Sequence, residues 1–283
     1  MDQPKKAYRN IDFLTGPRAR PVRILCEYSE PYERLQVHNI KDTVVFFGSA
    51  RARDAAEAAK MVDDAQAKLV GSPHDPALKK ALDRAQSAVK LSKWYEATRE
   101  LARRVTEWSE AREDGARRYL VCTGGGPGMM EAANRGAAEV EGGRSIGLGI
   151  SLPFEQGVND YVTRGLDFEF HYFFMRKYWF AYYMKAMVVC PGGFGTLDEL
   201  FEVLTLVQTR KIKKRVPIVL FGESFWRGIM NLDAMAEAGV ISEEDLELVH
   251  YTDSVDEAFD WLIAEIQRNE VDGMPGPVVS YEP

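Results

Sequence analysis

One glycine-rich turn constrains this chain more than any other feature of its sequence. Residues 191–199 read P-G-G-F-G-T-L-D-E, and they follow the apolar run at 186–190 without a gap. A buried strand that breaks into glycines and then opens a helix is typical of α/β proteins that bind phosphate, because free amide N–H groups and the positive end of the helix dipole face the anion. Glu199 would add a carboxylate one turn into this helix, where phosphate binding alone gains nothing from it. The turn therefore predicts phosphate binding joined to chemistry on something attached to the phosphate.

The composition is that of an ordinary globular protein. Its 283 residues suffice for one large α/β domain, and 46% of them are hydrophobic. The formal net charge of −7 lacks the basic signature of a nucleic-acid-binding protein, so we expect no nucleic-acid partner. No segment approaches the ~20 apolar residues of a membrane span, and the polar N-terminus lacks the apolar core of a signal peptide. We expect no membrane partner and a cytoplasmic location.

Metal and nicotinamide chemistry find no support in the sequence. The three cysteines (Cys26, Cys122 and Cys190) have no metal-ligand spacing, and the four histidines are scattered. The dinucleotide fingerprint G-x-G-x-x-G with an acidic residue ~20 positions later is absent, and neither long glycine-rich turn ends in the lysine and hydroxyl pair of a Walker A loop. We therefore expect no metal and no cofactor.

Short apolar runs alternate with helical patterns along the chain. The predicted strands are 43–47, 119–122, 144–150, 167–170, 186–190 and 216–221, and the helices between and after them include 131–139, 173–185, 196–210 and 225–238. This alternation predicts an α/β fold, a Rossmann-like parallel sheet with helices on both faces. The main domain would span residues 43–265. An N-terminal extension of 1–42 would pack on it, and a flexible tail of 266–283 would follow.

An alanine-rich, charged stretch follows the first predicted strand. Residues 54–91 are broken once at 71–76, and the second half carries a stripe of small and apolar residues at helical spacing: Leu78, Leu82, Ala85 and Val89. Asp75 followed by Pro76 is a good helix start. The pattern predicts an inserted helical hairpin that packs on another helix, of this chain or of a second subunit. A separate, longer helix with Trp94 and Leu101 on one face would follow it.

Two further glycine-rich turns also follow strands. Gly48 and Ser49 end the first strand, and Gly124, Gly125 and Gly126 end the second. Ligands of parallel sheets bind at the carboxyl ends of the strands, so all three turns are expected on one edge. A tight turn without a ligand is the alternative for the second of them.

Arg176 and Lys177 lie in the predicted aromatic helix, just before the strand that feeds the turn at 191–199. One interpretation is a snorkelling cation beside a surface ion pair. The other is a guanidinium next to Glu199 or the bound phosphate, where its planar fork suits an oxyanion.

Taken together, these motifs resemble one family. Met175-Arg176-Lys177, the turn at 191–199, the turn T-G-G-G-P-G-M at 123–129 and Gly48-Ser49 are similar to the LONELY GUY (LOG) family of Rossmann-like nucleoside monophosphate phosphoribohydrolases, often labelled lysine decarboxylase-like. The resemblance covers roughly residues 43–262 and favours the longer bacterial branch, whose stretch around 152–156 and Phe173-Phe174 is similar. The 54–91 hairpin and the N-terminal extension depart from the compact family pattern.

The resemblance implies hydrolysis of the N-glycosidic bond of a nucleoside 5′-monophosphate to free base and ribose 5-phosphate. Glu199 would act on the ribose, and Arg176 would position that carboxylate and the departing base. The expected substrate-binding residues are Gly48, Ser49, Gly124, Gly125, Gly126, Lys177, Gly192, Gly193, Gly195 and Thr196. A carboxylate that offsets developing positive charge agrees with this chemistry.

Several alternatives stay open at this stage. The chain could instead be a carrier that binds a nucleotide or a phosphate-bearing cofactor without turnover. The preferred base, adenine or an N6-prenylated adenine, is not readable from the sequence. Aromatic residues on more than one face of the 173–185 helix predict a homo-oligomer, at least a dimer, although the inserted hairpin could cover that surface within the chain.

Overall fold

Seven parallel strands form one sheet in the order β4-β3-β2-β1-β5-β6-β7. The structure, a computed structural model, describes residues 4–112, 118–152 and 157–271. The strands are β1 (Thr43–Phe47), β2 (Leu120–Thr123), β3 (Ser145–Ile150), β4 (Asp167–Phe170), β5 (Met184–Val189), β6 (Ile218–Phe221) and β7 (Val249–Thr252). Every neighbouring pair is parallel. The predicted α/β, Rossmann-like fold is confirmed.

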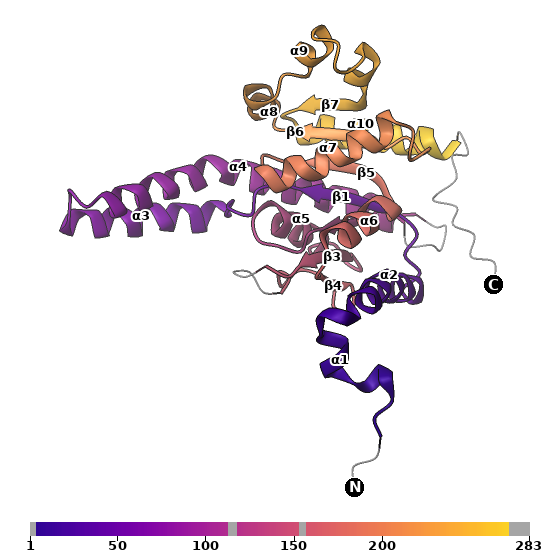
Figure 1. Ribbon diagram of the computed structural model, residues 1–283. Helices are drawn as coiled ribbons and strands as arrows, with labels where there is room; N and C mark the ends of the chain where they lie inside the picture. Colours follow the sequence, from indigo (N-terminus) through magenta and orange to yellow (C-terminus); the bar gives the residue numbers. More distant parts are fainter. Residues whose placement is uncertain (1–3, 113–117, 153–156, 272–283) are drawn as a thin grey trace.

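Helices cover both faces of the sheet (Figure 1). They are α1 (Ile11–Thr15), α2 (Arg20–Val37), α3 (Ala55–Gly71), α4 (Pro76–Glu110), α5 (Met129–Ala138), α6 (Phe173–Tyr183), α7 (Phe194–Gln208), α8 (Glu223–Ile229), α9 (Leu232–Glu237) and α10 (Val255–Val271), with 3-10 turns at Ala7–Arg9, Pro17–Ala19 and Glu243–Leu248. One core packs α4, α5 and α10 on the sheet, and the other packs α2, α6, α7 and α8. Because both faces are covered, the central strands read as continuous apolar runs rather than alternating ones.

The order of the strands reverses between β1 and β5, which are hydrogen-bonded neighbours. A chain leaving β1 and a chain leaving β5 therefore turn toward opposite faces, and such a switch point opens a crevice at the carboxyl edge of a parallel sheet. The three glycine-rich turns follow β1, β2 and β5, which are adjacent. The expectation that they share one edge is confirmed.

The inserted hairpin exists, but its second arm is longer than predicted. Asp54 caps α3 by accepting a hydrogen bond from the Glu57 amide, and Asp75 caps α4 in the same way with Pro76 in the first turn. The hairpin projects from the body (Figure 1). The predicted separate helix after residue 91 is wrong, because α4 continues through it as one 35-residue helix. Val89 of the predicted stripe is 43% exposed, whereas Ala88 is buried.

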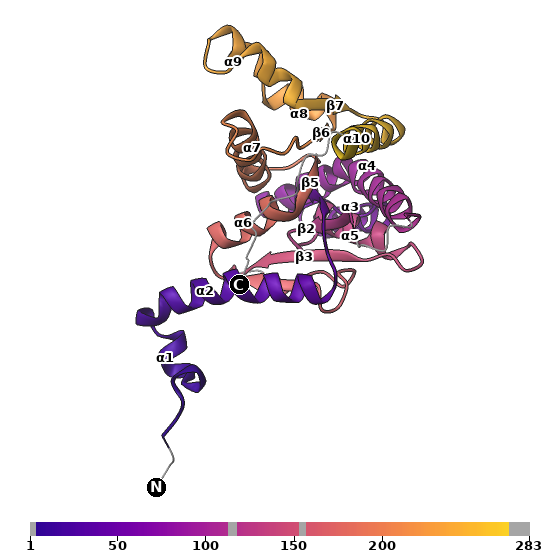
Figure 2. The ribbon, with the colours of Figure 1, turned by 90° about the vertical axis from the view of Figure 1, so that its right-hand side faces the viewer.

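The N-terminal extension covers the surface of α6 that the sequence left unassigned. Trp179 Nε1 donates to the carbonyl oxygen of Glu27 in α2 at 2.8 Å, and the rings of Tyr28 and Tyr178 lie 5.6 Å apart. Figure 2 shows α2 lying across the end of the molecule that carries β3 and α6. The second aromatic face of α6 is therefore packed within the chain, by α2 and not by the hairpin.

Several boundaries differ from the prediction, and three of these differences reassign a segment. α6 ends at Tyr183, so that Lys185 belongs to β5 and not to the helix. The predicted helix at 225–238 is broken into α8 and α9, since Asn231 caps a new helix by accepting from the Ala234 amide. α10 runs to Val271, beyond the boundary drawn at 265. The rest of the predicted tail, 272–283, lies outside the described residues.

Within the described ranges, no helix is long and apolar enough to cross a membrane.

Candidate active site

The N-terminus of α7 is an open helix end made of backbone. Gly193 is its N-cap residue, and no described side chain caps it. The first amide groups of a helix have no partner within the helix, and they point outward at the positive end of its dipole. A methyl group added at Gly193 or Gly195 would meet nothing within 4 Å. These glycines therefore leave the backbone open to a ligand.

Gly192 has a different role from its two neighbours. A methyl group at Gly192 would lie 2.1 Å from the Thr196 hydroxyl oxygen. The absence of a side chain there lets Thr196, which is buried, fold back under the turn. Gly192 therefore allows the turn to pack against Thr196, whereas Gly193 and Gly195 leave the backbone of the turn accessible.

Glu199 lies on the buried side of α7, one turn further along the helix. Its side chain is 5% exposed, and its Oε1 lies 3.6 Å from Arg176 Nη2. Burial raises the pKa of the Glu199 carboxyl to about 7, against the opposing effect of Lys177 and Arg176. Within the described residues, Oε1 has no hydrogen-bond partner. A buried carboxylate with a free oxygen is costly for folding and is more common at a functional site than elsewhere.

Arg176 connects two of the glycine turns. Its guanidinium lies near the rings of Phe173 and Phe180, at 5.4 and 5.8 Å from their centroids. A methyl group at Gly124 would lie 3.7 Å from Arg176 Nη1, so the guanidinium reaches from Glu199 to the turn after β2. Burial lowers the pKa of Arg176 despite the nearby carboxylates. Its Nε has no hydrogen-bond partner among the described residues. The interpretation of Arg176 as a guanidinium beside Glu199 is confirmed.

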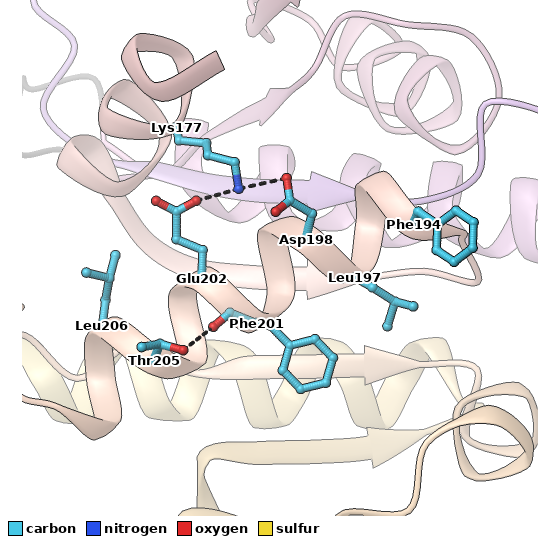
Figure 3. Close-up of a pocket in the computed structure, with 8 residues that line it drawn as sticks. All are labelled: Lys177, Phe194, Leu197, Asp198, Phe201, Glu202, Thr205 and Leu206. Atoms are coloured by element: carbon cyan, nitrogen blue, oxygen red, sulfur yellow. Dashed lines mark hydrogen bonds and ion pairs between the residues drawn. The ribbon is translucent and has the colours of Figure 1, made fainter.

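Lys177 pairs with carboxylates of α7. Its ammonium group lies 2.8 Å from Asp198 and 2.5 Å from Glu202 (Figure 3). It also lies 3.8 Å from the buried Glu199. A cavity of about 470 Å³ runs along this side of α7, lined by Lys177 and by residues of α7 that include Phe194 and Phe201. The two adjacent cations thus have different surroundings: Arg176 is buried between Glu199 and the Gly124 turn, and Lys177 lines the open groove.

Asparagine side chains hold the turn after β2, and the sequence analysis missed them. Asn159 Nδ2 donates to the carbonyl oxygens of Gly125 and Gly126, both at 3.1 Å, and to Asn134 Oδ1 at 2.9 Å. Gly125 has φ +70°, which only glycine adopts readily, and its amide donates to the Thr123 hydroxyl. Because Asn159 binds the carbonyl oxygens of Gly125 and Gly126, the turn is fixed in one conformation. Asn159 lies in a polar loop with no distinguishing pattern, so no sequence signal marked it.

The turn after β1 binds the other two turns together. The Ser49 amide donates to the Pro191 carbonyl at 2.9 Å, and the Ser49 carbonyl accepts from the Met129 amide at 3.1 Å. A methyl group at Gly48 would lie 2.6 Å from Met129 Cβ, so the strand must pass closely there. These contacts make Gly48 and Ser49 the link between the turns, and their expected contact with sugar and base stays a prediction.

At the carboxyl edge the structure thus assembles Glu199, Arg176, Gly124, Gly193 and Gly195, from three segments distant in sequence. The stretch at 153–156, part of the resemblance to the longer bacterial branch, lies outside the described residues. Across the described residues, no group of three histidine, cysteine, aspartate or glutamate side chains is positioned to hold a metal ion.

Comparison with known proteins agrees with this geometry. Residues 130–262 match the family described as possible lysine decarboxylase, which covers LOG proteins. The match includes Arg176 and the turn at 191–199, and it begins after the turns that follow β1 and β2. A search of curated proteins found no match for this chain.

Proposed function

Because the chain belongs over residues 130–262 to the family that covers LOG proteins, we propose that it hydrolyses the N-glycosidic bond of a nucleoside 5′-monophosphate. The products are the free base and ribose 5-phosphate. The observation that carries the proposal is Glu199, the sixth residue of a helix whose N-terminus no described side chain caps; its carboxyl is buried and keeps one oxygen without a hydrogen-bond partner among the described residues. Phosphate binding accounts for the helix end, and only a reaction on the attached sugar accounts for the acid.

Glu199 supplies the chemistry in this proposal. As the bond from C1′ to the base nitrogen breaks, its electron pair leaves with the base and positive charge develops on the ribose ring. The ionised carboxylate offsets that charge and takes a proton from the water that adds to C1′. Glu199 then gives this proton to the departed base, directly or through water, so that the free base forms and the carboxylate is restored. A pKa near neutrality suits a group that must accept and release a proton in this way.

Arg176 acts on the same step from the other side. At 3.6 Å from Glu199 Oε1 it holds the carboxylate toward the crevice without a close hydrogen bond that would quench it. Its Nη1 edge lies beside the Gly124 turn, where in this proposal it donates to the substrate. Arg176 therefore positions Glu199 and stabilises the charge on the departing base.

The lysine decarboxylase description does not fit the lysines of this site. A lysine that forms a Schiff base with an aldehyde cofactor must be neutral to attack. Burial disfavours the charge on Lys177, but its hydrogen bonds to Asp198 and Glu202 outweigh this and raise its pKa. Lys185 lies at the start of β5, at the opposite end of that strand from the glycine turn. The proposal therefore assigns no cofactor.

The proposal is tested by incubating the purified chain with AMP and with adenosine and measuring released adenine. If the 5′-phosphate is the handle, AMP is turned over at least about a hundredfold better than adenosine, since charge-assisted contacts to phosphate are lost with the nucleoside. Equal rates would refute the phosphate handle. Binding of AMP without base release would favour the carrier alternative, and a panel with N6-prenylated adenosine monophosphate then identifies the preferred base.

We also propose a homo-oligomer, on only part of the aromatic surface that first suggested it, together with Phe194. The second face of α6 is covered by α2, but Phe173, Phe174 and Phe194 are 50%, 51% and 93% exposed. With the apolar wall of the α7 groove, these residues form a surface that a second copy of the chain would bury. Light scattering on dilute protein should give at least twice the mass of one chain, and the mass of a single chain refutes the proposal. The cytoplasmic location stays a prediction.

A further inference from the structure

A second, smaller cavity lies at the opposite end of the sheet, where the central strands begin. It has a volume of about 130 Å³. The polar residues that line it come from the starts of β2, β5 and β6 and from the end of α10: Arg118, Lys185, Lys214, Arg215, Asn269 and Glu270. Lys185 opens β5 and the glycine turn closes it, so this cavity is separate from the candidate active site.

Positive charge exceeds negative charge around this cavity. Its lining carries four basic side chains, and the carboxylates that face them are Glu270 and the buried Asp42. Asp42 Oδ2 accepts from Arg118 Nε at 2.6 Å, and its Oδ1 lies 3.6 Å from Lys185. Glu270 pairs with Arg118 at 2.9 Å and with Arg112 at 3.1 Å. Both carboxylates are thus shared between two cations each, which leaves Lys185 only a long ion pair among the described residues.

The pKa of Lys214 reflects the same excess of positive charge around the cavity. Lys214 is 8% exposed, and its ammonium group donates to the Ala181 carbonyl at 2.6 Å and the Tyr182 carbonyl at 3.1 Å. These carbonyls at the end of α6 satisfy its hydrogen bonds but bring no full negative charge. Burial, and then repulsion from Lys185, lower the pKa of Lys214 to about 7 against the attraction of Asp42. A cavity in which neighbouring positive charge disfavours the protonation of a lysine is favourable for an anion.

We propose that this cavity binds a phosphate group, as inorganic phosphate or as the head of a phosphate monoester. The cavity is large enough for a tetrahedral anion. Ammonium groups on Lys185 and Lys214 supply point charges, and the Arg215 guanidinium group supplies a forked donor, which together suit phosphate oxygens. Arg118, held by Asp42 and Glu270, adds positive charge to the wall. A bound dianion would neutralise the excess charge that the protein leaves in place.

The test is calorimetric titration of the whole chain with inorganic phosphate at about pH 7. Lys185→Met should remove one phosphate per chain, or weaken its binding by about tenfold, because one charge-assisted contact is lost. Arg215→Gln should weaken the same binding event, and it preserves the fold because the Arg215 side chain is exposed. Lys213→Gln is the matched control, an exposed lysine of the same loop, and should bind phosphate as the unmodified chain does.

A second binding event from the α7 turn would be retained in all three variants, so that failure of the proposed function and failure of this site are distinguishable. Repeating the titration with ribose 5-phosphate separates the two sources, when only the binding event that Lys185→Met loses is compared: tighter binding than phosphate in that event indicates a monoester, and equal binding indicates the inorganic ion. If Lys185→Met and Arg215→Gln both bind phosphate with unchanged stoichiometry and affinity, the site does not exist.

Discussion

Glu199 and Lys214 are buried at opposite ends of the same sheet, and their pKa values are both moved to about 7 by burial. One starts as an acid and the other as a base, so the same physical cause shifts them in opposite directions. Their partners differ. Lys214 donates to two carbonyl oxygens, whereas Glu199 keeps one oxygen without a hydrogen-bond partner among the described residues. The difference teaches that a shifted pKa alone does not identify a catalytic group, and that a buried polar atom without a hydrogen-bond partner is the better sign.

The largest effect should separate the two ends of the sheet by activity. Arg176→Ala removes the charge beside Glu199 and near the Gly124 turn, and we expect base release from AMP to fall by about a thousandfold. Lys185→Met, at the other end of β5, should change the rate by less than about threefold. Steady-state adenine release on both variants is the measurement. Similar losses of rate in Arg176→Ala and Lys185→Met would contradict the assignment of catalysis to the carboxyl end of the sheet.

The dependence of stability on pH should have opposite slopes for the two groups. The folded pKa of Glu199 lies above its ordinary value of 4.5, so between these values the folded state binds more protons than the unfolded state, and the free energy of unfolding falls as pH rises to about 7. Glu199→Gln does not titrate and should be more stable than the unmodified chain by about 3 kcal/mol at about pH 8, and not at about pH 4. Urea denaturation at both pH values measures the difference. An equal effect at both would show that Glu199 is not destabilised by its burial.

For Lys214 the folded pKa lies below the ordinary value of 10.5, so the unfolded state binds more protons between about 7 and that value. The free energy of unfolding of the unmodified chain should therefore rise with pH above 7. In Lys214→Met this rise should be smaller, whatever the cost of the two lost hydrogen bonds, because that cost does not titrate. Urea denaturation of both proteins between about pH 7 and 10 measures how the free energy of unfolding changes with pH. The same pH dependence in both would contradict a lowered pKa for Lys214.

The smallest effect concerns the exposed backbone of the α7 turn. Gly195→Ala adds a methyl group where the structure has nothing within 4 Å, so the fold should be unaffected. If the phosphate lies against this backbone, KM for AMP should rise by about tenfold. Gly71→Ala, at an equally open position at the end of α3, is the matched control. An unchanged KM in Gly195→Ala would move the phosphate away from this turn.

Local patterns predicted the elements that local forces determine. β1 and β4 have the predicted bounds, because each is a short apolar or alternating run between turn residues. Arg176 and Glu199 were expected to meet because the sequence joins them through a single strand and turn, and the structure confirms it.

The features that the sequence did not reveal depend on contacts between distant residues. The packing of α2 on α6 joins Glu27 to Trp179, and nothing in either segment marks the other. The same holds for Asn159 and the carbonyls of Gly125 and Gly126. The end of α6 at Tyr183 was missed because the pairing of Met184 with Thr43 begins β5 there, and strand pairing overrides a helical pattern.

The central claim is that the carboxyl group of Glu199 acts in the chemical step, and one comparison tests it most directly. Single-turnover release of adenine from AMP is measured in Glu199→Gln and in Glu202→Gln, the same substitution one turn further along α7, where the carboxylate pairs with Lys177 on the groove side. We predict that Glu199→Gln loses about a thousandfold in rate while still binding AMP, and that Glu202→Gln loses less than about tenfold. Near-normal turnover in Glu199→Gln would contradict the account.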